Sequence, residues 1–324
     1  MKLNEWHEIR DRILVEQTPI RLDCLNPFYA LSSWRCVLDD IIATPGELLD
    51  QFRNTFVVDP VKNIVLTKGV RSFLRSAMIS NWGQSSSWIF PADVFPAYKE
   101  IAKETKVSFS EVTTWPMMNF NISAKPNSPT ILLLPVPHSP TGKDLTGDDL
   151  NEVVSWLKHS PMHYVVLDLV YAYTPLQPSV LMTLLQSSPN VLAAYSISKT
   201  WLQRCLAGFA DIPSKLFDDI SAHCESPLPQ ECGLAVRCLR DQPTLPEFQN
   251  QCFKNKWLEL LPEIYKASPQ WNPPQSGYLS TIELPWNILL ENHGILGVPP
   301  ALFGSSATGF TIISCLHDLV TNEP

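Results

Sequence analysis

The stretch Val191-Leu-Ala-Ala-Tyr-Ser-Ile-Ser-Lys-Thr-Trp201 joins a run of apolar residues to a short polar turn that carries Lys199. A continuous apolar run of this length is typical of a strand whose two faces are both buried. A second run, Tyr164-Val-Val-Leu-Asp168, ends on a carboxylate, with Tyr171 three residues further along the chain. Lys199 therefore follows one expected strand, and Asp168 ends another.

Short apolar runs alternate with helical periodicity through the middle of the chain, and this alternation predicts an α/β protein with a mainly parallel sheet. The other expected strands are Ile64–Thr67, Ser87–Phe90 and Thr130–Leu134, and the expected helices between them are Val70–Ser80, Ala97–Glu104 and Gly147–His159.

Both ends of the chain have a different pattern. An amphipathic helix is expected over Glu5–Val15 and a long helix over Leu245–Tyr265, with strands at Gly277–Leu284 and Phe310–Ser314. We predict that the termini together form a smaller α+β domain. The predicted parts are an N-terminal arm with part of the small domain (1–45), a large domain (46–229) and a C-terminal small domain (230–324).

Composition narrows the possible partners. The charged fraction is 17% and the net charge is -8, with Lys and Arg scattered, so no nucleic-acid or anionic-membrane surface is expected. No apolar stretch approaches the ~20 residues that a membrane helix needs. The eight cysteines form no Cys-x-x-Cys pair and the seven histidines no His-Glu-x-x-His motif, so we expect no metal. These features favour a cytoplasmic globular protein.

Each polar candidate also has an ordinary structural explanation when taken alone. A loop lysine is usually solvated, a carboxylate after a strand often caps a turn, and a tyrosine is often a half-buried core residue. Buried Asp168, however, would be costly without a positive partner, and the hydroxyls of Ser196 and Ser198 could both donate to one phosphate.

Together with Pro137-His-Ser-Pro-Thr-Gly142, these segments resemble the pyridoxal-phosphate (PLP) dependent aminotransferase superfamily, fold type I, class I/II, nearest to its histidinol-phosphate aminotransferase-like branch. That family commonly shows Asn-Pro-x-Gly, then Asp-x-x-Tyr after a strand, then Ser-x-Ser-Lys after the next strand. Here 29 residues separate Ser139 from Asp168, and 31 separate Asp168 from Lys199. The resemblance implies a mainly parallel seven-stranded sheet sandwiched by helices, with a smaller domain built from both termini.

The resemblance also implies roles for individual residues. Lys199 would hold PLP as a Schiff base, Asp168 would protonate the pyridine ring, and Tyr171 and Ser139 would approach the ring hydroxyl. The implied phosphate ligands are Gly69, Val70, Arg71, Ser196, Ser198 and Arg204, the implied ring-stacking residue is Phe95, and the implied substrate-side residues are Asn26 and Phe28. A small-molecule amino acid or amine substrate and a homodimer are implied as well.

Three departures from the family pattern bear on this prediction. Ser139 stands where asparagine is usual, and the usual phosphate arginine falls on Leu206 or Ala207, which leaves Arg204 or Arg71 for that role. Gly309–Ser314 lacks the arginine that usually binds the substrate carboxylate. Three explanations stay open: another arginine (Arg21, Arg35 or Arg237), a substrate that is not an ordinary α-amino acid, or lost catalysis.

The sequence therefore favours an aminotransferase that works through Lys199. The alternatives are a PLP-dependent lyase, decarboxylase or cyclase of the same fold, and a catalytically degenerate member. A nucleotide-binding α/β fold is disfavoured, because no Gly-x-Gly-x-x-Gly or Walker-type loop follows a strand.

Overall fold

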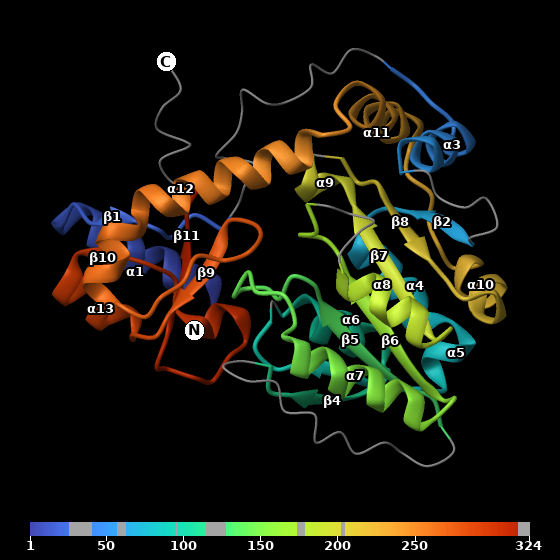
Figure 1. Cartoon of the computed structure of the whole chain (residues 1–324), viewed down its shortest axis with the longest axis horizontal. Helices are drawn as coiled ribbons and strands as arrows, with labels where there is room; N and C mark the ends of the chain where they lie inside the picture. The colour runs from blue at the N-terminus through green and yellow to red at the C-terminus, as the bar shows by residue number, and fades with distance from the viewer. Residues whose placement is uncertain are drawn as a thin grey trace.

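A seven-stranded sheet in the order β2-β8-β7-β6-β5-β3-β4 forms the centre of the protein (Figure 1). The computed structural model describes residues 1–25, 41–56, 63–94, 96–114, 128–173, 179–201 and 205–316. Strand β8 runs antiparallel to its neighbours β2 and β7, and the remaining pairs are parallel. The strands are β2 (Ile64–Thr67), β3 (Ser87–Pro91), β4 (Ser108–Val112), β5 (Thr130–Pro135), β6 (His163–Asp168), β7 (Val191–Ser196) and β8 (Gly208–Asp211).

The three central strands β5, β6 and β7 are buried along their whole length, which explains their continuous apolar sequences. Successive side chains point to opposite faces, so Val165 joins one apolar cluster and Val166 the other. In the register, Asp168 pairs with Pro135 on one side and with Ala194 on the other. The carboxyl ends of these strands therefore lie level with one another.

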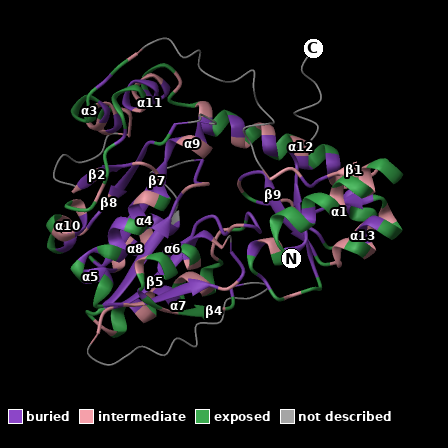
Figure 2. Cartoon of the chain, turned by 180° about the vertical axis from the view of Figure 1, so that it is seen from behind, coloured by how far each residue is buried: buried purple, intermediate pink, exposed green. Residues whose placement is uncertain are grey.

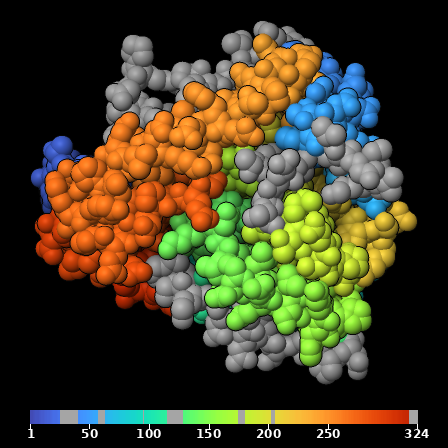
Figure 3. Space-filling model, viewed as in Figure 1, coloured from blue at the N-terminus to red at the C-terminus, as the bar shows by residue number. Residues whose placement is uncertain are grey.

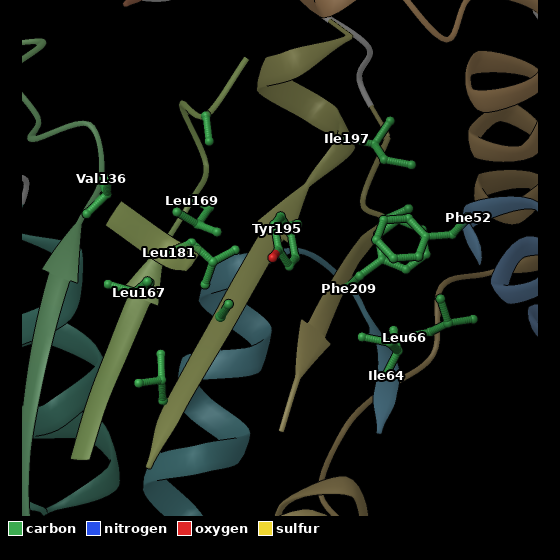
Figure 4. Close-up of a cluster of buried hydrophobic side chains, with 14 of the residues drawn as sticks. Phe52, Ile64, Leu66, Val136, Leu167, Leu169, Leu181, Tyr195, Ile197 and Phe209 are labelled. Atoms are coloured by element: carbon green, nitrogen blue, oxygen red, sulfur yellow. The ribbon is translucent and has the colours of Figure 1, made fainter. Parts of the chain in front are cut away.

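Helices cover both faces of the sheet (Figure 2), with buried residues in the sheet and exposed ones on the outer helix surfaces. One face packs against α3 (Pro45–Phe56), α7 (Gly147–His159), α8 (Ser179–Ser187) and α11 (Pro229–Asp241), and the other against α4 (Val70–Ile79), α5 (Asn81–Gln84), α6 (Ala97–Thr105) and α10 (Ser214–Ser221). In the first cluster, the rings of Phe52 and Phe209 stack with their centroids 3.7 Å apart (Figure 4).

The two ends of the chain build a second packed region. Strand β1 (Ile20–Arg21) pairs in parallel with β10 (Ile295–Leu296), and β9 (Leu279–Ile282) pairs antiparallel with β11 (Thr311–Ser314). Helix α1 (Leu3–Glu16) places Trp6 edge-on against Trp286 of α13 (Trp286–His293). A short 3-10 helix, η2 (Pro300–Phe303), precedes β11.

Helix α12 (Leu245–Ala267) runs along one face of the molecule from the large sheet region to this second region (Figure 3). The fold class predicted from sequence is confirmed, and the predicted strands over 64–67, 87–90, 130–134, 164–168 and 191–195 agree with the observed ones to within a residue. The domain boundaries at 45 and 229 stay a prediction.

Candidate cofactor and substrate site

Asp168 ends β6 and is buried, at 5% exposed. Tyr98 of α6 donates its hydroxyl to Oδ2 of Asp168 at 2.7 Å, and the backbone N–H of Val170 donates to Oδ1 at 2.9 Å. Burial raises the pKa of Asp168, whereas these two hydrogen bonds and the positive charge of Arg71 oppose the rise. Both carboxylate oxygens are therefore held in place by donors.

Lys199 lies on α9 (Ile197–Thr200), the single helical turn that follows β7. Its side chain is half-buried, and burial, together with the nearby charge of Arg71, lowers the pKa of the amine to about 8. Arg71 also acts electrostatically on Asp168 and on Tyr171. Arg71 thus acts on all three residues that the resemblance implied would work together, Lys199, Asp168 and Tyr171.

The turn between β2 and α4 approaches the same place. Gly69 has a φ of 86°, a left-handed conformation that favours glycine, and it caps the N-terminus of α4. A Cβ at Gly69 would lie 4.0 Å from Oγ of Ser196, and one at Gly208 would lie 2.8 Å from Cα of Gly69. Only a glycine at position 208 lets β8 come this close to the turn.

The donors around this turn suit a phosphate. Ser196 and Ser198 bring their hydroxyl oxygens to 2.8 Å from each other, and Arg71 is the second residue of α4. Backbone N–H groups at a helix N-terminus, hydroxyls and a guanidinium are the groups that bind phosphate in proteins. With Lys199 and Asp168 nearby, the residues present fit PLP as a bound group.

Tyr171 forms the other side of the site. Its ring meets that of Tyr278 edge-on, with centroids 5.7 Å apart, and the hydroxyl of Tyr278 donates to that of Tyr171 at 3.3 Å. Both tyrosines and Ser139 line a small pocket, with room for about one water molecule. Burial raises the pKa of both phenols, so they are neutral.

A buried network of hydrogen bonds holds His138, the residue before Ser139 in the chain. This histidine contacts the hydroxyl of Thr114 through Nε2 at 2.9 Å and that of Thr141 through Nδ1 at 3.0 Å. The backbone N–H of Thr114 donates to Oδ2 of Asp93 at 3.4 Å, and Ser305 donates its hydroxyl to Oδ1 of Asp93 at 2.8 Å. Burial lowers the pKa of His138 to about 4, so its ring is neutral.

The structure thus brings together most of the predicted site residues that it describes. Val70 belongs to the set only through its backbone, because its side chain packs in an apolar cluster. The predicted residues Asn26, Phe28, Phe95 and Arg204 lie outside the described residues, as does Arg35.

Two of the alternative arginines have partners elsewhere. Arg21 binds Asp23, with Nε 2.6 Å from Oδ1, and Arg237 is 3.6 Å from Asp241. At Thr311, in the strand where the resemblance places an arginine, the hydroxyl donates to the carbonyl of Leu284 at 2.6 Å.

Tyr98 and Tyr278 are the site residues that the sequence did not indicate. Tyr98 lies three residues after Phe95, a spacing that is also typical of two core residues on one face of a helix. Its contact with Asp168 joins positions 70 residues apart, and that of Tyr278 with Tyr171 joins positions 107 apart. A polar partner reached over such a separation has no local sequence signal.

Solved aminotransferase structures share this fold. The aspartate aminotransferase from Rhizobium meliloti superposes with a TM-score of 0.74 at 16% identity, covering 99% of this chain and 94% of that one. The aspartate aminotransferase from Thermotoga maritima gives 0.73 at 17% identity with the same coverages. These likenesses show that the chain has the same fold as these two structures.

The sequence identifies the family. The model of the family described as aminotransferase class I and II matches residues 46–209, half of the chain, so the chain belongs to this family. Its members are PLP-dependent. A histidinol-phosphate aminotransferase from Chlorobium phaeovibrioides is 25% identical over 149 residues. That match spans 44% of this chain and 40% of the relative.

Two kinds of feature are absent from the described residues. No group of three or more His, Cys, Asp or Glu side chains in this part of the chain is arranged to hold a metal ion. None of its helices is both long enough and apolar enough to cross a membrane.

Proposed function

We propose that this protein is a PLP-dependent aminotransferase that moves the amino group of an amino acid or related amine to a 2-oxo acid. The observation that carries the proposal is the lowered pKa of the half-buried Lys199 amine beside Arg71. Arg71 also acts on the buried Asp168. PLP, when bound, supplies an aldehyde and a ring that accepts the electrons of a bond broken at the amine carbon.

Different residues around Lys199 would bind the phosphate and the ring of PLP. Gly69, Val70 and Arg71 of the α4 turn would hold the phosphate, with the hydroxyls of Ser196 and Ser198 facing them. Arg204 is a further candidate for this role. Because the phosphate is doubly charged, a guanidinium together with several neutral donors suits it better than hydroxyls alone.

The ring is held by other residues. Asp168 would face the ring nitrogen, and the hydrogen bonds from Tyr98 and Val170 would orient its carboxylate and favour the ionised form. Tyr171 and Ser139 would approach the ring oxygen, and Phe95 would stack on the ring. Asn26 and Phe28 are proposed to border the substrate.

Lys199 is also suited to move a proton. With a pKa of about 8, its Nζ has an appreciable neutral fraction near neutral pH, unlike an ordinary lysine near 10.4. A neutral amine can take a proton from the substrate carbon and return it to another atom, as a general base whose pKa lies near the working pH does. The burial that lowers this pKa also limits the access of water.

The experiment is an absorption spectrum of the purified protein with added PLP. We expect a visible band in the wild type that is lost in Lys199→Ala and kept in Lys158→Ala, a substitution of an exposed lysine on α7. Amino acids and amines are then screened for bleaching of the band, and a 2-oxo product with an aminated acceptor establishes transamination. A folded protein with no Lys199-dependent band contradicts the proposal.

The product decides between the remaining chemistries. Release of CO2, of a β or γ substituent, or of a cyclised product assigns lyase, decarboxylase or cyclase chemistry to the same site. The proposal includes a homodimer, which rests on the family resemblance, and a cytoplasmic location, which rests on the composition of the sequence. Sedimentation velocity at micromolar concentration tests the dimer, and a monomer at every concentration contradicts it.

A further inference from the structure

The phenol of Tyr278 is held in place by its surroundings. The residue is 1% exposed and lies directly before β9. Its ring meets the ring of Phe253 of α12 with centroids 5.7 Å apart, and its backbone carbonyl accepts the N–H of Cys315 at 3.1 Å. The preceding Gly277 is fixed as well, because its carbonyl accepts the indole N–H of Trp257 at 3.1 Å. Tyr278 therefore belongs to the packed region that the two ends of the chain build.

The hydroxyl of Tyr278 reaches two acceptors. The phenol oxygen of Tyr171 lies 3.3 Å away, and the carbonyl oxygen of Leu25 lies 3.4 Å away. Both distances exceed the usual upper limit of about 3.0 Å for an O–H···O bond, so neither acceptor binds the hydroxyl firmly. A phenol has one proton to donate and can accept at the same time, whereas a carbonyl can only accept. The single proton of Tyr278 is therefore shared between Tyr171 and Leu25.

This sharing changes once Tyr171 has an acceptor of its own. Burial raises the pKa of both phenols, so each keeps its proton. The family resemblance assigns Tyr171 to the ring oxygen of PLP, which is an acceptor. When Tyr171 donates to that oxygen, its own oxygen becomes a better acceptor, because hydrogen bonds in a chain polarise one another. The proton of Tyr278 then turns from Leu25 toward Tyr171.

We propose that Tyr278 is a positioning residue for PLP, whose hydroxyl donates to the Tyr171 oxygen and thereby directs the Tyr171 proton to the ring oxygen. The inference rests on the proposed function, since it needs Tyr171 at that oxygen. It also gives the region built from the chain ends a part in holding the cofactor, because Tyr171 follows β6 of the large sheet whereas Tyr278 precedes β9.

The test compares two ligands by isothermal titration calorimetry of the full-length protein. They are PLP and 3-deoxypyridoxal 5'-phosphate, which has hydrogen in place of the ring hydroxyl. We expect Tyr278→Phe to weaken binding of PLP about 3- to 10-fold, the usual range for one hydrogen bond. Its affinity for the 3-deoxy ligand should stay at the wild-type value, because that ligand offers Tyr171 no oxygen to donate to.

Two further variants separate this role from packing. Tyr173→Phe removes a hydroxyl that is buried in the same apolar cluster and has no hydrogen-bond partner among the described residues. The ring of Tyr173 also meets Phe253 edge-on, with centroids 5.5 Å apart, so this control should keep the wild-type ratio of the two affinities. In a Tyr171→Phe background, Tyr278→Phe should leave the ratio unchanged, because Tyr278 acts through the Tyr171 hydroxyl.

An affinity ratio unchanged by Tyr278→Phe overturns the inference, and so does equal weakening of both ligands, which assigns Tyr278 to packing alone. A full effect of Tyr278→Phe in the Tyr171→Phe background overturns it as well. A wild type that binds both ligands without a Lys199-dependent visible band contradicts the proposed function, whereas the ratio still tests Tyr278. A wild type that binds neither ligand overturns both proposals.

Discussion

At the scale of single residues, Lys199 departs most from the behaviour of its type. Burial and the charge of Arg71 both lower the pKa of its amine, to about 8. Both causes disfavour the charged form, so Lys199 loses its proton some two units below an ordinary lysine. The neutral amine, which is the nucleophile, is therefore populated at lower pH than in the other lysines.

The pH dependence of labelling tests this. Pyridoxal, which lacks the phosphate, is trapped on the cofactor-free protein with borohydride, and modification of Lys199 is measured by peptide mass spectrometry from pH 6.5 to 10. We expect the rate to rise with pH with a midpoint near 8, and exposed lysines to react with midpoints above 10. In Arg71→Gln the midpoint moves upward, because a nearby positive charge is removed.

Arg75→Gln is the matched control for this prediction. Arg75 lies one turn further along α4 and pairs with Glu104 on the surface, with the two charged atoms 2.6 Å apart. Its removal should leave the Lys199 midpoint in place. A wild-type midpoint near 10 would show that the amine is not perturbed.

At the scale of elements, the close approach of β8 to the Gly69 turn shapes the phosphate site. A Cβ at position 208 would lie 2.5 Å from the carbonyl oxygen of Tyr195 and 2.8 Å from Cα of Gly69. Both are backbone atoms, so neither can move aside without shifting β7 or the turn. Position 208 of β8 must therefore be glycine for the strand to pack this closely against β7 and the Gly69 turn.

Gly208→Ala should accordingly destabilise the protein by about 1–3 kcal/mol, the usual cost of overpacking, and weaken binding of PLP through the displaced turn. Thermal unfolding and a PLP titration measure the two effects. Gly147→Ala is the control, since no atom lies within 4 Å of its added Cβ at the start of α7. Equal stability of the two variants would contradict the steric explanation.

The elements that could be predicted from sequence are the strands whose burial on both faces gives a continuous apolar run in the sequence. Strands β5, β6 and β7 are buried on both faces and were predicted nearly to the residue. Strand β4, at the sheet edge, is largely exposed and polar, and the four-residue β8 begins with glycine and ends with aspartate, so neither shows the pattern.

The candidate site likewise contains residues that could be predicted from sequence and residues that could not. Lys199, Asp168 and Tyr171 stand at or just after strand ends, and the family resemblance implied that they act together. The partners Tyr98 and Tyr278 come from α6 and from the loop before β9, and only the tertiary packing of those elements defines the contacts. Arg21 and Arg237, in contrast, pair with carboxylates two and four residues further along the chain.

At the scale of the whole molecule, Asp93 joins the large sheet region to the segment that follows η2. It is buried at 7% exposed and accepts from Ser305 through Oδ1 and from the backbone of Thr114 through Oδ2. Thr114 in turn contacts His138, the neighbour of Ser139 in the pocket wall. The position of the pocket wall therefore depends on contacts between segments more than 200 residues apart in sequence.

Asp93→Asn tests this connection with almost no change in volume. An amide has one acceptor oxygen, so either Ser305 or the N–H of Thr114 loses its partner, and a buried unsatisfied donor costs about 1–3 kcal/mol. We expect a lower midpoint of thermal unfolding, and we expect the loss of order to reach His138 through Thr114.

The control is Asp50→Asn, an exposed carboxylate on α3, which should leave the midpoint within experimental error. The spread to His138 is measured from the chemical shifts of its ring protons, which should move in Asp93→Asn alone. Unchanged His138 shifts together with a lowered midpoint would confine Asp93 to local packing and remove it from the support of the pocket.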